Sequence, residues 1–218
     1  MFTLYGVDLS NNVTKVKFAA NAMNLTYDFK NVNLMAGEQK TPEFLRINPA
    51  GRVPAIDDNG FKLFESNAIC RYLADSNNSP LFPEDAKKRA VIDQWMDFAS
   101  IHVATAMARL FFNTVIYKMM NVPKDEQSYA DGLKFLGQFL PIVEKQLSQN
   151  RYMAGNEFSL ADISMLASLE QSEVVSFDLS KYPKIVEWRK GLMSQFWYQK
   201  VHKNAGETLQ KIMAGAGA

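Results

Sequence analysis

The first third of the chain alternates between two hydrophobic periods. Positions that alternate between apolar and polar are typical of half-buried strands, and apolar residues that recur every three or four positions are typical of helices. Strands are predicted at 2–6, 26–34, 53–56 and 61–64, and helices at 14–24, 38–45 (in part) and 66–75. The predicted order is therefore β-α-β-α-β-β-α. A βαβ start favours parallel pairing of the first two strands, and the closing hairpin adds antiparallel strands.

The rest of the chain is helical in pattern. A polar, turn-prone stretch at 76–80 (SNNSP) precedes Leu81-Phe82-Pro83, and this composition is typical of a linker. Helical spacing then predicts helices at about 86–117, 127–149, 159–175, 183–195 and 200–213, with a frayed GAGA end. These patterns divide the chain into an α/β domain at 1–76, a linker at 77–86 and an all-helical domain at 87–218.

Composition and charge exclude several classes of partner. With 24 basic and 23 acidic residues, the net charge of +1 gives no indication of nucleic acid or an anionic membrane as a partner. No apolar run of spanning length and no signal peptide pattern is evident, so a cytoplasmic protein is expected. Cys70 is the single cysteine, and His102 and His202 have no companions at ligand spacing, so no disulfide or metal is expected.

Residues 48–70 (NPAGRVPAIDDNGFKLFESNAIC) contain the most informative local features. Pro54 cannot donate a hydrogen bond to a sheet, so it belongs at a strand start, an edge or a bulge. The run from Asp57 to Gly60 has the residues of a tight hairpin turn. Taken singly, Pro54 makes a turn and Ser66 caps the helix that follows it. Ser159 and Asp162 are likewise spaced as a capping box at another helix start.

Four patterns together carry a resemblance to a known family. They are LYGVDLSNNVTKV at 4–16, NPAGRVPAI at 48–56, FESNAI at 64–69 and SLADISMLASL at 159–169. The chain resembles the soluble glutathione transferases, in particular their serine-type classes. AGEQKTPEFLRINP at 36–49 is similar to the delta, phi and theta classes. The resemblance implies a thioredoxin-like α/β domain followed by an all-α helical bundle.

The resemblance also implies a glutathione site. A cis peptide bond before Pro54 would free the backbone of Val53 to hold the cysteinyl part of glutathione as an added strand. Ser66 and the first-turn N–H groups of its helix would bind the γ-glutamyl carboxylate, and Glu65 its amine. The residues expected at the glycyl end are Gln39, Lys40 and Arg52.

The thiol of glutathione must be activated, because an ordinary thiol has a pKa of about 8.5. The resemblance places the activating hydroxyl at Ser10, as a hydrogen-bond donor to the sulfur, with Tyr5 as the second candidate. Two features depart from the family pattern: Asn11 and Asn12 follow Ser10, and Asn67 stands where an arginine commonly follows the Glu-Ser motif. The loss of that arginine could weaken carboxylate binding.

The second substrate of such an enzyme is a small hydrophobic electrophile, bound between the two domains. The residues expected to contact it are on the long helix of the second domain: Met107, Phe111, Phe112, Val115 and Tyr117. Adjacent Phe111 and Phe112 cannot face the same way on a helix, so one of them is expected to point away from the core.

Three functions are compatible with these features. The first is a detoxifying glutathione transferase, with glutathione as co-substrate, no cofactor, and peroxidase activity as a side reaction. The second is an assembly module, because TPEFLRINPAGRVPA and FESNAI also resemble the transferase-like domain of the gamma subunit of eukaryotic elongation factor 1. The third is a ligandin that stores hydrophobic compounds. The resemblance further implies a two-fold homodimer.

Overall fold

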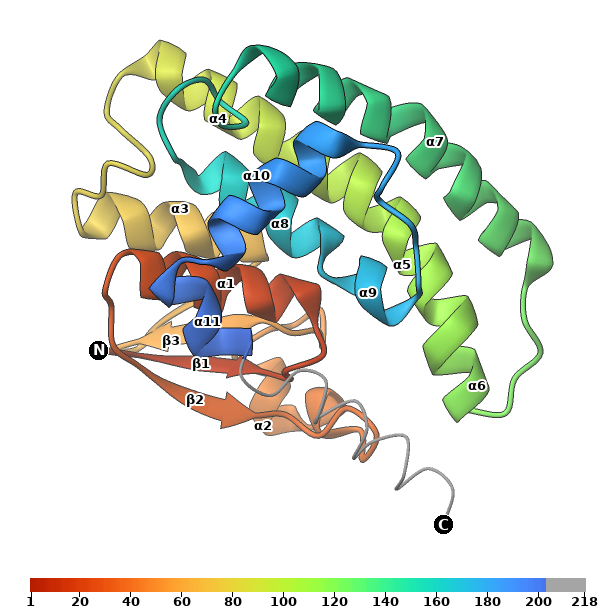
Figure 1. Ribbon diagram of the computed structural model, residues 1–218. Helices are drawn as coiled ribbons and strands as arrows, with labels where there is room; N and C mark the ends of the chain where they lie inside the picture. Colours follow the sequence, from red (N-terminus) through yellow and green to blue (C-terminus); the bar gives the residue numbers. More distant parts are fainter. Residues whose placement is uncertain (203–218) are drawn as a thin grey trace. The chain divides into compact units, whose positions relative to one another are not determined.

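A computed structural model describes residues 1–202, which form two compact units (Figure 1). The first unit holds Met1–Pro83 and the segment that begins at Phe196, and the second holds Glu84–Gln195. The predicted α/β domain followed by helices is confirmed.

A four-stranded mixed sheet forms the centre of the first unit. Its strands are β1 (Phe2–Gly6), β2 (Tyr27–Asn31), β3 (Ala55–Asp58) and β4 (Phe61–Phe64), in the order β2-β1-β3-β4. As predicted, β1 is parallel to β2, and β3 and β4 form an antiparallel hairpin. The turn is shorter than predicted, because Asp58 pairs with Phe61 and only Asn59 and Gly60 remain to reverse the chain with positive φ. Pro54 directly precedes β3, which is a position where its missing N–H costs no ladder bond.

Helices lie on both faces of this sheet. α1 (Asn11–Ala22) and α3 (Ser66–Ser76) lie on one face, and η1 (Glu38–Lys40) and α2 (Pro42–Leu45) lie on the other (Figure 1). Leu4 and Ile56 of the central strands are fully buried. The alternation of buried and half-buried residues along β1 follows from the opposite directions of successive side chains in a strand.

The last described helix, α11 (Phe196–His202), packs on α1 in the first unit. Phe18 lies 5.4 Å from the ring of Trp197 and 5.1 Å from that of Tyr198. The helix therefore starts before the predicted 200–213, and the rest of that prediction, with the frayed end, lies outside the described residues. Sequence analysis had assigned this segment to the helical domain, but its aromatic contacts are with the first unit. The domain limits at 76 and 87 stay a prediction.

The second unit is entirely helical. Its elements are α4 (Ala86–Phe98), η2 (Ala99–Ala104), α5 (Thr105–Phe111), η3 (Phe112–Ile116), α6 (Tyr117–Met119), α7 (Glu126–Gln149), α8 (Leu160–Leu169), α9 (Gln171–Val174) and α10 (Pro183–Met193). The helix predicted at 86–117 is thus continuous but contains two π-helical segments, η2 and η3. The helix predicted at 159–175 divides at Glu170 into α8 and α9.

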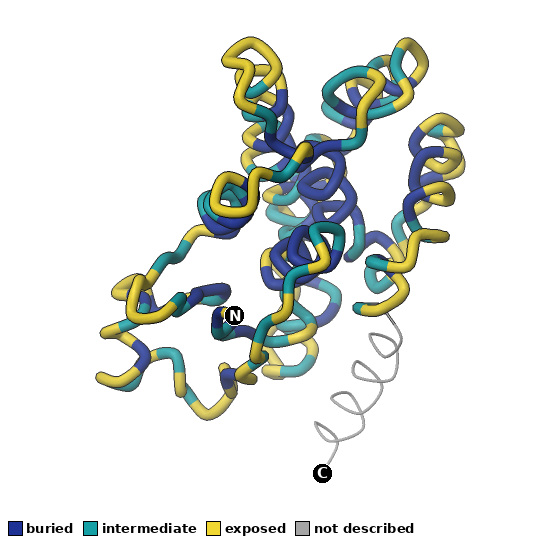
Figure 2. The backbone as a smooth tube through the Cα atoms, turned by 90° about the vertical axis from the view of Figure 1, so that its left-hand side faces the viewer, coloured by how far each residue is buried: buried dark blue, intermediate teal, exposed yellow. Residues whose placement is uncertain are grey.

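α8 is buried along its whole length. In Figure 2 the buried stretches of the backbone lie inside and the exposed ones at the periphery. The serines of α8 meet the long helix where the π-helical segment begins. Ser164 Oγ donates to the carbonyl of Met96 at 3.4 Å. Ser168 Oγ lies 2.7 Å from the carbonyl of Ser164 and 3.3 Å from that of Ala99, and its single proton is shared between these two acceptors. These serines thus offer donors to buried carbonyls where the helical ladder changes its register.

The continuous helix Ala86–Met119 is long and apolar enough to cross a membrane by length and composition alone, which sequence analysis did not detect. Half of its most apolar window is buried, and its η2 and α5 segments pack against α8 and α7. The packing is that of a core helix in a helical domain.

Gly132 of α7 allows close approach to α5. A Cβ added there would lie 3.0 Å from the carbonyl oxygen of Ala106 and 3.1 Å from Cβ of Arg109, and would overlap the side chain of Leu110.

We expect Gly132→Ala to lower the free energy of unfolding by about 1–3 kcal/mol, because the helices must separate. Urea denaturation measures this. Gly137→Ala on the same helix is the matched control, since its added Cβ meets nothing within 4 Å; it should gain up to about 1 kcal/mol from helix propensity. Equal gains in both variants would contradict the packing argument.

Asp162 lies fully buried at the start of α8 and accepts four hydrogen bonds. Its Oδ1 accepts from Met153 N (2.8 Å) and Trp188 Nε1 (3.0 Å), and its Oδ2 from Ser159 N (3.0 Å) and Ser159 Oγ (3.2 Å). Burial raises the pKa of the Asp162 carboxyl to about 6, although all four donors act to lower it. The carboxyl thus links the start of α8 to the preceding loop and to α10.

We expect Asp162→Ala to lower the free energy of unfolding by about 3–5 kcal/mol, because buried donors lose their acceptor. Thermal and denaturant unfolding followed by circular dichroism would measure the loss. Asp178→Ala is a suitable control, because that carboxylate lies on the surface and accepts two hydrogen bonds from the nearby Ser180. A melting temperature for Asp162→Ala that matches the control would refute the structural role.

Candidate functional site

Strand register brings the candidate glutathione residues of the first unit to one end of the sheet. Ala55, the first residue of β3, pairs with Tyr5 near the end of β1 and with Phe64 at the end of β4. The segments that flank these pairs are the loop to Ser10, the Val53–Pro54 bond and the Glu65–Ser66 pair. Three segments that are far apart in sequence are therefore neighbours.

Ser10 is the N-cap of α1. Its Oγ accepts a hydrogen bond from Val13 N at 3.4 Å, and its side chain is half-buried. A serine hydroxyl that accepts a bond still has a proton to donate. The hydroxyl also lies at the positive end of a 12-residue helix, which favours a negative charge beside it.

Ser66 begins α3 and contacts α1 directly. Its Oγ donates to Asn12 Oδ1 (3.2 Å) and accepts from Lys15 Nζ (3.2 Å), and Lys15 Nζ also donates to Asn67 Oδ1 (2.8 Å). The N-terminal turns of α1 and α3 are thus joined by a polar network. Glu65 has a φ of 71°, which is uncommon for a residue other than glycine, and such backbone conformations cluster at functional sites.

The loop before β3 is held by a buried asparagine. Asn48 Nδ2 donates to the Arg52 carbonyl (2.6 Å), and Asn48 Oδ1 accepts from Ala50 N (3.0 Å). The Val53–Pro54 peptide bond that follows is cis, as the resemblance implies. Val53 precedes β3 and is half-buried, so its backbone lies beside the ladder that β3 forms with β1.

The residues expected at the glycyl end lie close to this loop. A Cβ added to Gly51 would lie 3.0 Å from the Gln39 carbonyl and 3.2 Å from Lys40 Nζ, so the η1 turn packs on the residue before Arg52. Gly51 also has a φ of 59°, and both features require glycine there. Within residues 1–202, Gln39 Oε1 is buried and accepts no hydrogen bond, which marks a polar group with unused bonding capacity.

Tyr5 lies on the α2 side of the sheet. Its ring is 6.3 Å from that of Phe44 in α2, and Lys30 Nζ lies 5.6 Å from the ring centre. Because Tyr5 packs there, whereas Ser10 caps the helix of the other face, the two candidate hydroxyls have different surroundings.

The five candidates for electrophile binding divide into two sets in the second unit. Met107, Phe111 and Val115 are buried in its core. Phe112 is 49% exposed, and its ring lies 6.5 Å from that of the half-buried Tyr117. As predicted for adjacent phenylalanines, Phe111 faces the core and Phe112 does not. Phe112 and Tyr117 are therefore the two members that keep solvent-accessible surface.

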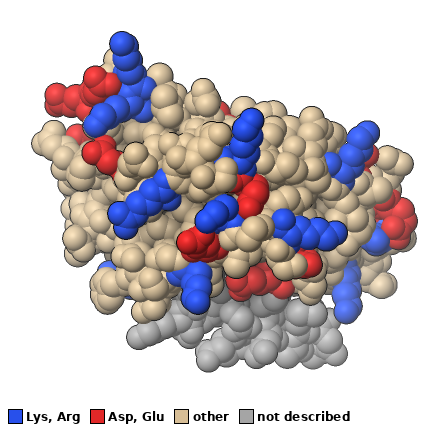
Figure 3. Space-filling view, turned by 45° about the horizontal axis from the view of Figure 1, so that its top comes forward, with Lys and Arg blue, Asp and Glu red and all other residues tan. Residues whose placement is uncertain are grey.

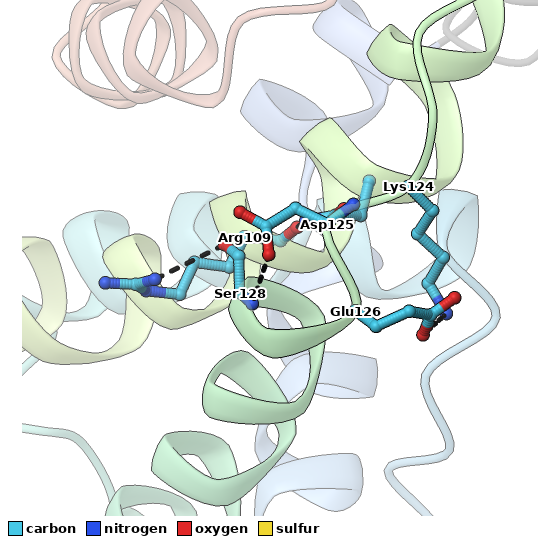
Figure 4. Close-up of polar contacts among 6 residues, drawn as sticks. Arg109, Lys124, Asp125, Glu126 and Ser128 are labelled. Atoms are coloured by element: carbon cyan, nitrogen blue, oxygen red, sulfur yellow. Dashed lines mark hydrogen bonds and ion pairs between the residues drawn. The ribbon is translucent and has the colours of Figure 1, made fainter.

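A polar network holds the end of the long helix against the start of α7 (Figure 4). Buried Asn113 donates to the Arg109 carbonyl (2.8 Å) and accepts from Asp125 N (2.7 Å), and Asp125 caps α7 through Ser128 N. Arg109 Nη1 donates to Ser128 Oγ at 3.3 Å, so Arg109 points toward α7. This network fixes the helix that carries Phe112 and Tyr117.

Sequence reasoning assigned no binding role to Asn12, Lys15 and Asn48. All three lie inside quoted motifs, and Asn12 was noted only as a departure from the family pattern. Lys15 follows one turn after Asn11 in an apolar helix pattern, and a lysine on that buried face was the signal that could have identified it. Within residues 1–202, no group of three or more His, Cys, Asp and Glu side chains could hold a metal ion.

Comparison with known proteins extends these observations to most of the chain. The family profile of the glutathione S-transferase N-terminal domain matches residues 1–75, and that of the C-terminal domain matches residues 101–195. Glutathione S-transferase 1 of Zea mays is 33% identical over 202 residues, covering 91% of this chain and 94% of the relative. Glutathione S-transferase D7 of Drosophila melanogaster is 34% identical over 192 residues, which cover 86% of this chain and 82% of the relative.

A solved structure of glutathione S-transferase I bound to lactoylglutathione is 31% identical, with a TM-score of 0.84. The match covers 92% of this chain and 97% of the chain in that structure. The relatives are named as transferases, which favours the enzyme over the assembly module and the ligandin. On the strength of two matching domains in the expected order, the chain belongs to the glutathione S-transferase family.

Proposed function

We propose that this protein conjugates glutathione to small hydrophobic electrophiles, with glutathione bound at the end of the sheet formed by β1, β3 and β4. The observation that carries the proposal is the polar network between the starts of α1 and α3, beside the cis Val53–Pro54 bond. A cytoplasmic location accords with this chemistry.

Glutathione is a γ-linked tripeptide, and its three parts match three features of the site. The Val53 backbone holds the cysteinyl part as an added strand, and Ser66 with the N–H groups of α3 receives the γ-glutamyl carboxylate. Glu65 pairs with the γ-glutamyl amine. Gln39, Lys40 and Arg52 lie around the glycyl end, where a carboxylate would be met by two cations.

Ser10 stabilises the thiolate without forming a covalent bond. Its hydroxyl donates to the sulfur, and the N-terminus of α1 adds a favourable dipole, so that both lower the pKa of the bound thiol. The thiolate then attacks the electrophilic carbon, a carbon–sulfur bond forms, and the leaving group departs with the electron pair. Holding both substrates side by side supplies the remaining acceleration.

Phe112 and Tyr117 contact the electrophile in this proposal. Both are aromatic and both keep accessible surface, as suits a small apolar compound. Lysine and arginine side chains are interspersed with acidic ones over the face shown in Figure 3. Such mixed charge accords with a small-molecule substrate better than with a large polyanion.

Ser10→Ala should lower kcat/KM for conjugation of a chlorinated nitroaromatic by roughly 10- to 100-fold, because a charge-assisted hydrogen bond to the thiolate is lost. The pKa of the bound thiol should rise by about 1–2 units, as measured by thiolate absorbance against pH. Retention on immobilised glutathione should persist.

Tyr5→Phe is the matched control, because it removes the other candidate hydroxyl while keeping the ring that packs on Phe44. It should retain activity close to that of the native chain. If Tyr5→Phe loses activity and Ser10→Ala keeps it, Tyr5 has the activating role. A native chain that is retained on glutathione without turnover would be a ligandin, and one that is not retained would be an assembly module.

A two-fold homodimer is also part of this proposal. In the second unit, Phe98, His102, Phe139 and Phe135 form a half-buried aromatic row with ring separations of 5.0, 4.5 and 6.2 Å. Ile101, one turn from Phe98, is 63% exposed, and in the first unit Phe61 of β4 is 50% exposed. A second copy that covers such apolar side chains would remove them from water.

Sedimentation equilibrium should give about twice the chain mass of 24.7 kDa. Ile101→Asp should shift the mass toward that of one chain, because a charge would be buried in the interface. Val186→Asp is the control, since Val186 on α10 is 42% exposed and lies away from the aromatic row in sequence and element. A native chain that sediments as a monomer at all concentrations would reject the dimer.

A further inference from the structure

The fifth residue of α1 is a lysine with its amine inside the protein. Lys15 is only 2% exposed, although lysine is almost never fully buried unless it is paired. Its Nζ lies 2.8 Å from Asn67 Oδ1 and 3.2 Å from Ser66 Oγ. α1 therefore directs a cation into the first turn of α3.

That position is electrostatically unusual. The first-turn N–H groups of α3 have no acceptor within the helix and no side-chain cap at its N-cap residue, and Lys15 itself lies near the positive end of α1. A cation at two positive helix ends raises the free energy of the free protein. The N-terminus of α1, the N-terminus of α3 and the Lys15 amine each attract negative charge, so together they favour a bound anion strongly.

Asn67 positions the amine of Lys15. It occupies the position where an arginine commonly follows the Glu-Ser motif, and it carries no charge of its own. Its side-chain oxygen accepts from Lys15, and so holds the amine beside the hydroxyl of Ser66. The positive charge at the start of α3 thus comes from α1, across the gap between the two helices.

We propose that Lys15 recognises the γ-glutamyl α-carboxylate of glutathione, with Asn67 as its positioning residue. This inference rests on the proposed function, since it assigns a residue to the site that binds glutathione. Lys15 then determines specificity: it selects thiols that carry a carboxylate at this point over otherwise equal thiols that lack it.

The test compares two ligands by calorimetry: glutathione, and the γ-aminobutyryl analogue that lacks only the α-carboxylate. In Lys15→Met, which keeps most of the buried stem, glutathione should bind roughly 10- to 100-fold more weakly, as expected for loss of a charge-assisted bond. The analogue should bind almost equally to both proteins. Adding Asn67→Arg to Lys15→Met should restore most of the affinity for glutathione.

Lys17→Met is the matched control. Lys17 lies on the same helix and is 9% exposed, but its amine pairs with Asp8 and lies 3.4 Å from the centre of the Phe29 ring. The Lys17 variant should keep the native preference for glutathione over the analogue. Circular dichroism would establish that each variant folds.

Asn67→Asp covers the case in which Lys15→Met does not fold, because Asn67 is half-buried and the change is isosteric. A fixed carboxylate beside the amine should reduce the preference for glutathione by about tenfold or more. If the native protein binds neither glutathione nor the analogue, the proposed function itself is wrong. A native protein that binds glutathione, with the same preference in Lys15→Met or Asn67→Asp, would overturn the role of Lys15 alone.

Discussion

The antiparallel pairing of β1 with β3 is the constraint on which the candidate glutathione site depends. Because Ala55 stands opposite both Tyr5 and Phe64, the segments next to these residues meet at one end of the sheet. A slip of one residue would reverse every side chain of the strand and would bury polar groups of β3 under the helices. Apolar Leu4 and Ile56 exclude that slip, since both are fully buried in the observed register. Core packing therefore sets the geometry of the site.

Several positive groups meet at this end of the sheet, beside the acidic residue Glu65. Two helix N-termini and the amine of Lys15 converge there, and Lys40 lies close to the loop before β3. A protein that concentrates positive potential in one place lowers its own stability a little. A ligand with a thiolate and two carboxylates would return that free energy on binding. The arrangement suits glutathione in charge as well as in shape.

The helical unit uses a different kind of constraint. Gly132 lets α5 and α7 approach closely, and Asn113 with Arg109 ties the end of the long helix to the start of α7. Asp162 joins the start of α8 to Met153 and Trp188. These contacts hold Phe112 and Tyr117 on a fixed helix, so the surface that we propose for the electrophile is rigid and apolar. Rigid placement of this kind lowers the entropy cost of binding.

The first helix, expected at 14–24, begins at Asn11 with Ser10 as its N-cap, whereas the sequence by itself determined the order of the elements, the hairpin, the helix starts at Ser66 and Ser159, and the family. These depend on local rules: hydrophobic period, turn residues and capping chemistry act over a few neighbouring positions. Only the tertiary structure decided that Lys15 reaches Ser66, 51 positions away, or that Asn48 holds the loop before Pro54. It also decided that Met107, Phe111 and Val115 are core residues while Phe112 is exposed. Such outcomes depend on which helix faces pack against each other. A periodic sequence pattern indicates that one face of a helix is buried, but it does not indicate which element packs against that face.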